Sequence, residues 1–365
     1  AANVSDLSAS YDAIIDTSVA APTELDLAAI DDSGSSPIDN ITNKTSGLTI
    51  SGSAAEEGAT ITIFDDVNNN GVQNGSEATL GTATVLGGTF STDITLGAGL
   101  HHVVATQTDV AGNVSGGSTA LDITVDTAAP SAPVVASITS DSGSSGTDEI
   151  TNDNTLLING TAAANSSVEV FKDGVSIGVT TANGAGAWTF DYTGTALADG
   201  TYNFTATATD AAGNTSGLSA ALPATIDTLT PTVAVNIVDA SLSDGDASSV
   251  VTFTFSDATT NFTAADITAV GGTVTGLSGS GTSYTATFTA TDGFTGTGSV
   301  SVTAGSYTDA AGNAGATGSD VVAIDRLNPT VAVDVVDTSL NDGDISSVVN
   351  FTFSEATTNF DSTDI

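Results

Sequence analysis

Residues 201–214 read TYNFTATATDAAGN, a strand-like stretch that runs into a turn phrase. Apolar residues occupy every second position from Tyr202 to Ala208, which is the spacing of a β-strand with one buried face. The turn phrase D-x-A-G-N at Asp210 also occurs at Asp109 and Asp309, so its copies lie 101 and 99 residues apart. A period near 100 residues predicts a string of similar β units, each the size of one small domain.

The stretch around residues 201–214 predicts the fold class of the whole unit. Short β-rich runs alternate there with turn residues, and seven strands of this length are what an immunoglobulin-like sandwich requires. We therefore expect an all-β chain of tandem immunoglobulin-like β-sandwich domains. The expected strands are 134–138, 155–160, 167–171, 175–181, 187–192, 201–209 and 220–226.

A second recurring phrase marks the unit boundaries. An aspartate is followed by a proline four residues later at Asp126, Asp227 and Asp325. Residues 231–267 and 329–365 agree at 27 of 37 positions, so the last stretch begins another copy of the unit before it. The predicted organisation is the end of a preceding repeat at 1–16, repeats at 17–126, 127–227 and 228–325, and the start of a further repeat at 326–365.

The composition limits the partners. Only 3 lysines and arginines stand against 43 aspartates and glutamates, so the formal charge of −40 disfavours nucleic acid and anionic membrane surfaces. The hydrophobic fraction of 39% is high for a disordered acidic chain, and no apolar run is long enough for membrane insertion. The chain has no cysteine, so we expect cross-bracing from packing and from hard cations such as calcium.

One local motif has the spacing of a calcium loop. The residues at Asp66, Asn68, Asn70, Gly71 and Glu77 satisfy D-x-[DN]-x-[DN]-G-x5-E. Three side chains, the Val72 carbonyl and a bidentate glutamate can surround a calcium ion, while the glycine permits the sharp turn. A solvated Asn- and Gly-rich turn is the alternative interpretation. The predicted metal ligands of this loop are Asp66, Asn68, Asn70, Val72 and Glu77.

The flanks of this motif differ from those of an EF-hand. Residues 60–64 and 78–85 are typical of strands, not helices, so we expect a loop within a β-hairpin. Phe64 to Gly81 spans 17 residues, whereas the matching stretch from Phe171 to Gly178 spans 7. The first repeat therefore contains an insertion of ten residues relative to the second.

The junctions between repeats form a second set of predicted metal sites. In a sandwich of this topology, the linker and the first loop of one repeat could meet the loops of the next. Gathered carboxylates repel one another unless a cation intervenes, which predicts calcium at the junctions. Ordinary turn formation by Asp, Asn and Gly is the alternative. One hypothetical set is Asp141, Asp148, Glu149, Asp227, Asp309 and Asn313, and the equivalent set is Asp31, Asp32, Asp39, Asp126, Asp210 and Asn214.

The sequence contains no recognisable catalytic residues. There is no Ser/His/acid arrangement, and the only histidines, His101 and His102, are strand neighbours that point to opposite faces, which favours structural roles. Trp188 lies in an alternating aromatic stripe that we interpret as packing, with a binding stripe as the alternative. We expect no enzyme activity.

The recurring phrases together carry a family resemblance. The D-x-A-G-N loops, the Asp126-Thr127 and Asp227-Thr228 linkers, and the strand start at 200–202 resemble bacterial Ig-like repeats. Such repeats fill the extender regions of giant secreted adhesins, including those exported by type I systems with RTX tails. Residues 228–325 and 326–365 lack the tyrosine phrase and resemble a second subfamily.

The resemblance implies a function. It implies a structural extender of a bacterial cell-surface adhesin, located outside the cell, active in adhesion and biofilm formation and rigidified by calcium. Its partners would be calcium and neighbouring repeats, with any surface glycan or cell partner bound through domains outside this chain. Two alternatives remain at this stage: a glycan- or cell-binding Ig-like module, and a spacer in a secreted polysaccharide-active enzyme.

Overall fold

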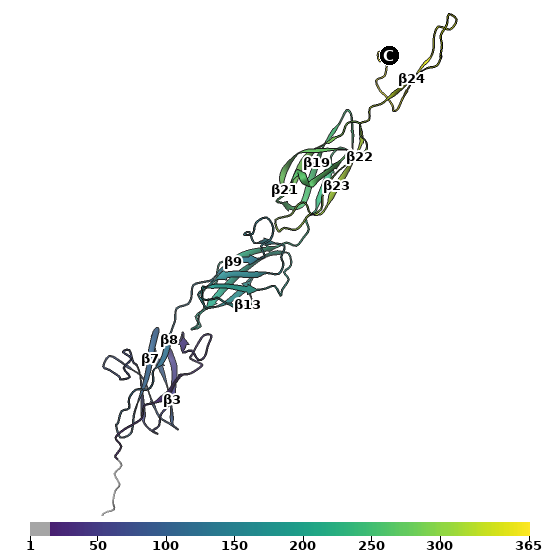
Figure 1. The fold of residues 1–365 in the computed structure, drawn as a ribbon. Coiled ribbons are helices and arrows are strands. Elements are labelled where there is room, and N and C mark those ends of the chain that lie inside the picture. Colours follow the sequence, from purple (N-terminus) through teal and green to yellow (C-terminus); the bar gives the residue numbers. More distant parts are fainter. Residues whose placement is uncertain (1–14) are drawn as a thin grey trace, which may run out of the picture. The chain divides into compact units, whose positions relative to one another are not determined.

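The computed structural model describes residues 15–365, whose regular elements are β-strands apart from one short 3-10 helix, Ala264–Asp266 (Figure 1). The expected end of a preceding repeat, at 1–16, lies almost wholly outside these residues. The chain divides into two compact units, and the division passes through the second repeat. One unit holds the chain up to Thr139 with Leu157–Tyr192 and Tyr202–Pro223, and the other holds Ser140–Leu156, Thr193–Thr201 and the chain from Ala224.

The first repeat forms two sheets, ordered β1-β3-β6 and β2-β8-β7-β4-β5. Inward-facing aliphatic side chains such as Ile50, Ile61 and Val103 are fully buried between them. The strands are β1 (Thr23–Leu27), β2 (Ile41–Thr42), β3 (Ser46–Ser53), β4 (Thr60–Asp65), β5 (Thr79–Thr84), β6 (Thr89–Thr95), β7 (Gly99–Thr108) and β8 (Leu121–Val125).

The second repeat has sheets ordered β14-β11-β9 and β10-β16-β15-β12-β13. The seven strands expected from the sequence all form, within three residues at each end, and confirm the all-β prediction. A two-residue strand, β10, pairs in parallel with β16 and escaped prediction because it is too short to show alternation. The strands are β9 (Val134–Thr139), β10 (Ile150–Thr151), β11 (Leu157–Thr161), β12 (Ser167–Lys172), β13 (Val175–Thr181), β14 (Ala187–Asp191), β15 (Gly200–Thr209) and β16 (Leu222–Ile226).

A tight turn joins β12 to β13. Its central residues, Asp173 and Gly174, both have positive φ, at 50° and 79°. Such a turn has the twist that two antiparallel strands need, and aspartate and glycine tolerate it best. Val168 and Val170 on β12 are buried, so the strand register that this turn sets places the apolar face of β12 in the core.

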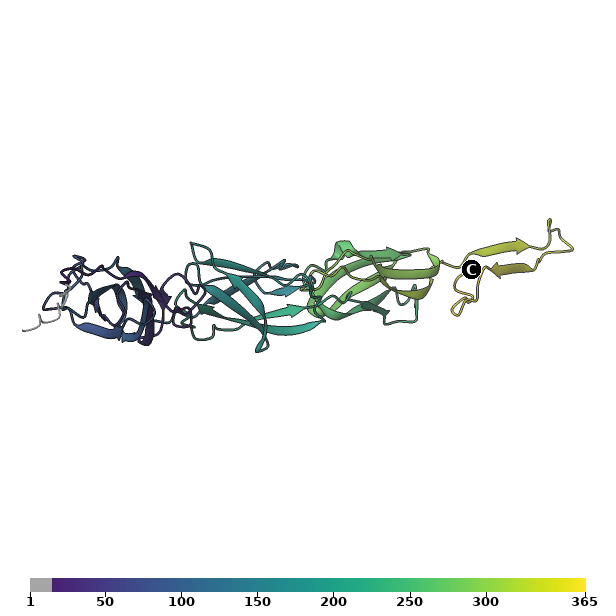
Figure 2. The same ribbon diagram turned by 90° about the horizontal axis from the view of Figure 1, so that it is seen from below.

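The third repeat packs sheet β17-β19-β21 against sheet β18-β23-β22-β20 (Figure 2, green). An aromatic cluster of Phe253, Phe255, Phe262, Tyr284 and Tyr307 fills part of its core. The strands are β17 (Val233–Ile237), β18 (Ser241–Ser243), β19 (Ser248–Thr259), β20 (Ile267–Val270), β21 (Gly272–Ala290), β22 (Thr295–Val302) and β23 (Gly318–Asp325).

Residues 326–365 contain one hairpin, β24 (Val331–Val335) with β25 (Val349–Phe353). Val331, Val333 and Val335 remain exposed here, whereas the matching Val233 and Ile237 of the third repeat are buried. In the third repeat, β17 packs against β22 and β23, which cover this face.

Candidate metal centres

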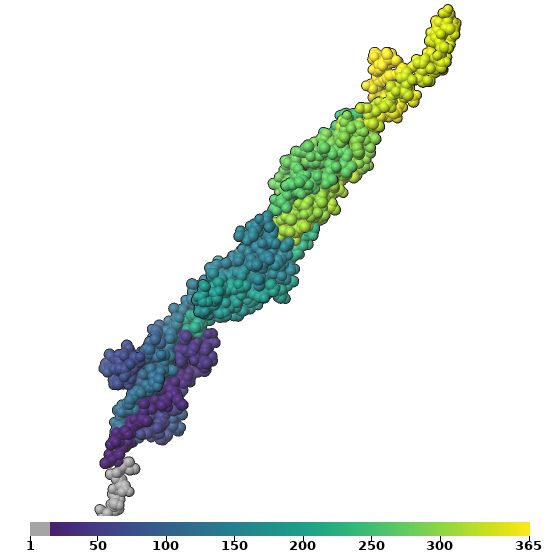
Figure 3. Space-filling view, in the orientation of Figure 1, coloured from purple at the N-terminus to yellow at the C-terminus, as the bar shows by residue number. Residues whose placement is uncertain are grey.

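The inserted loop of the first repeat lies between β4 and β5, as the sequence predicted. Ile63 pairs with Gly81 across this hairpin, and the matching pair in the second repeat is Val170 with Gly178. The paired residues are therefore 18 apart in the first repeat and 8 apart in the second, which confirms the ten-residue insertion. The loop stands out from the first repeat as a lobe (Figure 3, blue-violet).

Asp66 organises the first half of this loop. Its side chain is only 1% exposed, and its carboxylate accepts hydrogen bonds from the backbone N–H of Asn70 (3.1 Å) and Gly71 (2.6 Å). The Asn70 side chain in turn accepts one from Val72 N at 2.8 Å, and Gly71 has φ +73°. These bonds fold the loop around the Asp66 carboxylate, and the glycine permits the turn without strain.

Glu77 supplies the second buried carboxylate of the loop. It is 6% exposed, and its Oε2 accepts a hydrogen bond from Asn74 N at 2.7 Å. Its Oε1 is buried without a hydrogen-bond partner among the described residues. A buried carboxylate oxygen without a partner is costly, and a hard cation would satisfy it. The residues present therefore fit a calcium ion, although Asn68 and Asn70 are exposed and Val72 is 59% exposed.

A glycine on the neighbouring segment makes room for the loop. A Cβ atom added to Gly117 would lie 2.4 Å from Gly71 O and 2.8 Å from a Val104 methyl. In the second repeat the matching residue is Leu218, because Ser118 and Ser219 make the same bonds to Ala105 N and Ala206 N. Sequence reasoning missed Gly117. The available signal was that the repeat with the insertion has a glycine at the position where the second repeat has Leu218.

One linker gathers a second acidic group. Carboxylate oxygens of Asp16, Glu56 and Asp109 lie within 4.8 Å of one another. Burial raises the pKa of Glu56, and the charges of Asp16 and Asp109 raise it further. Burial alone would raise the pKa of Asp109, but hydrogen bonds from Asn113 and from the backbone of Gly112 and Ala111 hold it below its usual range. The sequence analysis did not single out Asp16 or Glu56.

One asparagine joins each linker to a D-x-A-G-N loop. Asn214 Nδ2 donates to the Asp126 carbonyl (2.8 Å) and lies 3.1 Å from an Asp210 carboxylate oxygen. Asn313 Nδ2 is placed in the same way between the Asp227 carbonyl (2.8 Å) and Asp309 (3.0 Å). Asn113 repeats this geometry with Asp16 and Asp109. The asparagines therefore link the backbone of the linker aspartates Asp126 and Asp227 to the loop carboxylates Asp210 and Asp309, respectively.

Negative charge accumulates around Asp227. Burial raises the pKa of Asp227, a hydrogen bond from Leu229 N opposes this rise, and the charges of Asp309, Asp257 and Asp199 add to it. Asp199 also accepts hydrogen bonds from Thr228 N and Oγ1, both at 2.9 Å. The arrangement repels itself when ionised, which is the electrostatic setting a cation relieves.

The first loops of the repeats hold further acidic residues of the predicted junction sets. Asp141 Oδ2 accepts a hydrogen bond from Glu149 N at 3.2 Å, while its Oδ1 is buried without a partner among the described residues. The equivalent Asp32 also has a buried Oδ1 without a partner among the described residues. Burial and, to a smaller degree, the charge of Asp39 raise the pKa of Asp32, while a hydrogen bond from Asn40 N opposes this rise.

Asp31, which the sequence analysis placed in a junction set, has other partners. Its carboxylate makes an ion pair with Lys44 at 2.9 Å and accepts a hydrogen bond from Thr49 N at 3.0 Å. A carboxylate already neutralised by a lysine is a poor metal ligand. We therefore remove Asp31 from the predicted ligands.

The histidines and Trp188 have partners within their own repeats. His101 Nδ1 pairs with Asp65 (2.7 Å) and His102 Nδ1 with Asp122 (2.6 Å), so the two rings face different partners. Trp188 is 3% exposed, and a Cβ at Gly160 would lie 2.3 Å from its ring. The packing interpretation of Trp188 is confirmed, and it offers no exposed platform for a sugar.

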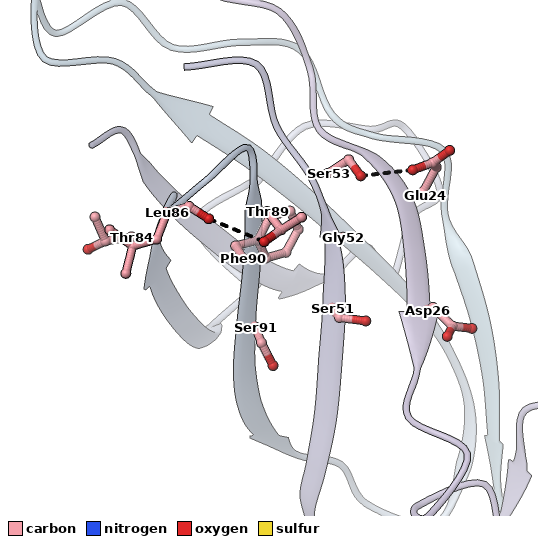
Figure 4. A pocket seen from close by; sticks show the side chains of 10 residues that line it. All are labelled: Glu24, Asp26, Ser51, Gly52, Ser53, Thr84, Leu86, Thr89, Phe90 and Ser91. Atoms are coloured by element: carbon pink, nitrogen blue, oxygen red, sulfur yellow. Dashed lines mark hydrogen bonds between the residues drawn. The ribbon is translucent and has the colours of Figure 1, made fainter. Parts of the chain in front are cut away.

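An open pocket on the first repeat also lacks an aromatic platform (Figure 4). Phe90, its one aromatic residue, is 4% exposed, and Glu24 is engaged by Ser53 Oγ at 2.8 Å. The pocket contains none of the predicted metal ligands. It is lined by Glu24, Asp26, Ser51, Gly52, Ser53, Thr84, Leu86, Thr89, Phe90 and Ser91.

The sandwiches and their recurring linker geometry define a tandem Ig-like β protein. One family model, described as a bacterial Ig-like domain, matches residues 18–127 and 129–228, and a second model with the same description matches 227–324. The chain therefore belongs to the bacterial Ig-like domain family. No helix among the described residues is long and apolar enough to cross a membrane.

Solved structures with similar folds come from several proteins. A tetra-tandem repeat from the extending region of a large adhesion protein is 18% identical, covers 92% of this chain and 88% of its own, and has a TM-score of 0.28. A structure from a 1.5-MDa bacterial ice-binding adhesin is 20% identical, with 84% and 99% coverage and a TM-score of 0.35. Invasin, a bacterial integrin-binding protein, is 15% identical, with 86% and 65% coverage and a TM-score of 0.33. Identities and TM-scores this low carry no argument about function, and no curated protein matches the chain.

Proposed function

We propose that this chain is an extender segment of a bacterial cell-surface adhesin, in which calcium at the inserted loop and at the linkers restricts motion between Ig-like repeats. One observation carries the proposal. At each of three linkers, an asparagine joins the linker aspartate to the aspartate of a D-x-A-G-N loop. A geometry that repeats at three linkers, with like charges gathered around Asp16 and around Asp227, favours a role in how successive repeats are connected.

Electrostatics supplies the mechanism. The chain carries a formal charge of −40, and the carboxylates at the linkers repel one another when no cation is present. Calcium bound between a linker and a loop would remove this repulsion and tie the two segments together. The ligands we assign are Asp16, Glu56 and Asp109 at one linker, Asp126 and Asp210 at the next, and Asp227 and Asp309 with Asp199 and Asp257 at the third.

The inserted loop would bind a separate ion within the first repeat. Asp66 and Glu77 are its buried carboxylates, with Asn68, Asn70 and the Val72 carbonyl as further oxygen ligands. In this proposal the exposed asparagines turn inward on binding, so the ion orders the loop. Asp141, with its orphaned buried oxygen, is the remaining predicted ligand.

The proposed location is outside the cell. Extracellular calcium modules bind with dissociation constants of about 10⁻⁴ to 10⁻³ M, so sites of this kind fill outside the cell and stay empty in a cytosol. A structural role also agrees with the lack of any catalytic arrangement in the sequence. The neighbouring repeats of the same chain are then its direct partners, and adhesion would depend on domains elsewhere in the protein.

The test is thermal unfolding of the full chain in EDTA, in millimolar calcium and in millimolar magnesium, with small-angle scattering on the same samples. Calcium is expected to raise the unfolding temperature and to lengthen the particle, with magnesium less effective because it demands stricter geometry. The Asp227→Asn/Asp309→Asn double variant should lose part of the lengthening. Scattering curves that are identical in EDTA and calcium would rule out the proposed mechanism.

A further inference from the structure

A serine-glycine loop of the first repeat contacts the D-x-A-G-N loop of the second, and both belong to the same compact unit. Ser33 Oγ donates a hydrogen bond to Ala212 O at 2.7 Å, and Ser35 N donates to Ala211 O at 3.4 Å. Asn43 N donates to Ser33 Oγ at 2.8 Å and holds the hydroxyl in place. The contact uses one hydroxyl and backbone groups, and no carboxylate.

Glycine is required on the serine side of this contact. Gly34 has φ +98°, and a Cβ atom added there would lie 1.8 Å from Ala211 O. On the other side, a Cβ at Gly213 would lie 3.1 Å from Gly34 Cα. The two loops therefore meet backbone to backbone, closer than any side chain allows.

The same contact occurs again in the other compact unit. Ser142 Oγ donates to Ala311 O at 2.6 Å, and Asn152 N donates to Ser142 Oγ at 2.8 Å. Gly143 has φ +99°, and its added Cβ would lie 2.0 Å from Ala310 O. The partner loop here belongs to the third repeat, which matches a different family model, so the contact depends on the short loop phrase and not on the rest of the repeat.

We propose that the Ser-Gly loop, Ser33–Gly34 and Ser142–Gly143, is a docking element that recognises the D-x-A-G-N loop of the repeat that follows it, independently of calcium. The partner is defined by chemistry: two backbone carbonyls followed by a glycine in a left-handed turn. This inference goes beyond the calcium mechanism, because none of the assigned metal ligands takes part in the contact.

The burial of the phrase differs between the copies that a Ser-Gly loop covers and the one that has no such loop among the described residues. Ala212 and Ala311 are buried, at 1% and 0% exposure, where a Ser-Gly loop covers them. Ala111, the matching residue of the first copy, is exposed, and an added Cβ at Gly112 would meet nothing within 4 Å among the described residues. The glycine has φ between +91° and +94° in all three copies, so the turn itself calls for glycine, whereas the burial of the alanine follows the loop that packs on it.

The test is amide hydrogen exchange of the full chain in EDTA and in calcium, with Gly34→Ala against the control Gly112→Ala. Both glycines have similar φ, +98° and +94°, so both variants carry the same backbone strain and only the first blocks docking. Gly34→Ala should speed exchange at Ser35 about tenfold in both solutions, and Gly112→Ala should leave it unchanged. Equal effects of the two variants, or loss of Ser35 protection from the wild-type chain in EDTA, would overturn the proposal.

A milder pair of variants covers the case in which Gly34→Ala disturbs the first repeat itself. Ser33→Ala removes only the hydroxyl, and Ser142→Ala does the same in the other unit. Each should speed exchange a few-fold at its own contact and leave the other contact unchanged. No change in either variant would contradict recognition through the hydroxyl. A calcium response that persists in the three docking variants, Gly34→Ala, Ser33→Ala and Ser142→Ala, would keep the proposed calcium mechanism separate from docking.

Discussion

The hairpins β4–β5 and β12–β13 occupy the same place in successive repeats, yet only the first contains the inserted loop. Both begin with a matched anchor: Asp66 N donates to His102 O, and Asp173 N donates to Asn203 O, each at 2.9 Å. In the second repeat the Asp173 carboxylate accepts a hydrogen bond from Asn203 N. In the first, Asp65 accepts the equivalent bond from His102 N, which leaves the Asp66 carboxylate free to organise the loop.

The two repeats also differ at two positions outside the inserted loop. In the first repeat the Asp65 carboxylate accepts the hydrogen bond from the neighbouring strand. Gly117 occupies the position that Leu218 has in the second repeat. Leu218 is 58% exposed, so its side chain has no packing role that the first repeat had to preserve. The two hairpins therefore differ by a ten-residue loop without any difference in strand register.

The largest expected effect comes from making the first hairpin like the second. Replacing residues 66–78 by Asp-Gly-Val, the sequence at 173–175, should remove one calcium site completely while the sandwich still folds, because the strand pairing on both sides is identical. Calorimetric titration of the full chain should count one site fewer than in the wild type. An unchanged stoichiometry would show that the loop binds no calcium.

The next effect isolates one carboxylate. Glu77→Gln should weaken calcium binding at the loop by at least about tenfold, or ~1.4 kcal/mol, because a bidentate charged ligand becomes a neutral one. In EDTA the same variant should unfold at a higher temperature, since it removes a buried negative charge for which only one of the two carboxylate oxygens has a hydrogen-bond partner among the described residues. Opposite signs in the two solutions are the diagnostic result.

The matched control for this variant is Glu169→Gln, which changes a carboxylate on the hairpin that has no loop. Glu169 accepts a hydrogen bond from Ser176 Oγ at an exposed site. The Glu169→Gln variant should leave the calcium affinity unchanged. A loss of affinity equal to that of Glu77→Gln would mean that net charge, not the loop, determines binding.

The smallest effect tests the neighbour of the loop. Gly117→Leu should weaken calcium binding by about tenfold or less, because the new side chain displaces Gly71 O at a typical overpacking cost of about 1–3 kcal/mol. Leu218→Gly, the reverse change in the second repeat, should leave calcium binding unaltered. Titrations in which Gly117→Leu matches the wild type would contradict the contact between the loop and this segment.

Local patterns in the sequence predicted much of this protein. The alternation from Tyr202 to Ala208 predicted β15, and a difference in spacing located the insertion. These features depend on residues close together in the chain, whose spacing alone sets strand periodicity and turn type. Ligand pairs such as Asp126 with Asp210 were also within reach, because both belong to phrases with the same period.

Contacts between distant residues were beyond sequence reasoning. Asp31 lies in an acidic stretch, but Lys44 neutralises it across a loop, and Glu56 joins Asp16 and Asp109 only through the packing of three segments. The sequence around Gly34 is that of an ordinary turn, and only the fold places Ala211 O against this glycine. No periodic pattern encodes such meetings, since each depends on how loops from different strands are brought to one end of a sandwich.

The sequence by itself determined the repeat period, the all-β sandwich and the position of the calcium-loop motif, because periodicity, turn residues and ligand spacing are local properties of the chain. The tertiary structure alone decided which carboxylates are buried without partners, which are already neutralised, and which glycines separate two backbones. These depend on burial and close approach, and burial is a property of the packed molecule that residues distant in the sequence create together.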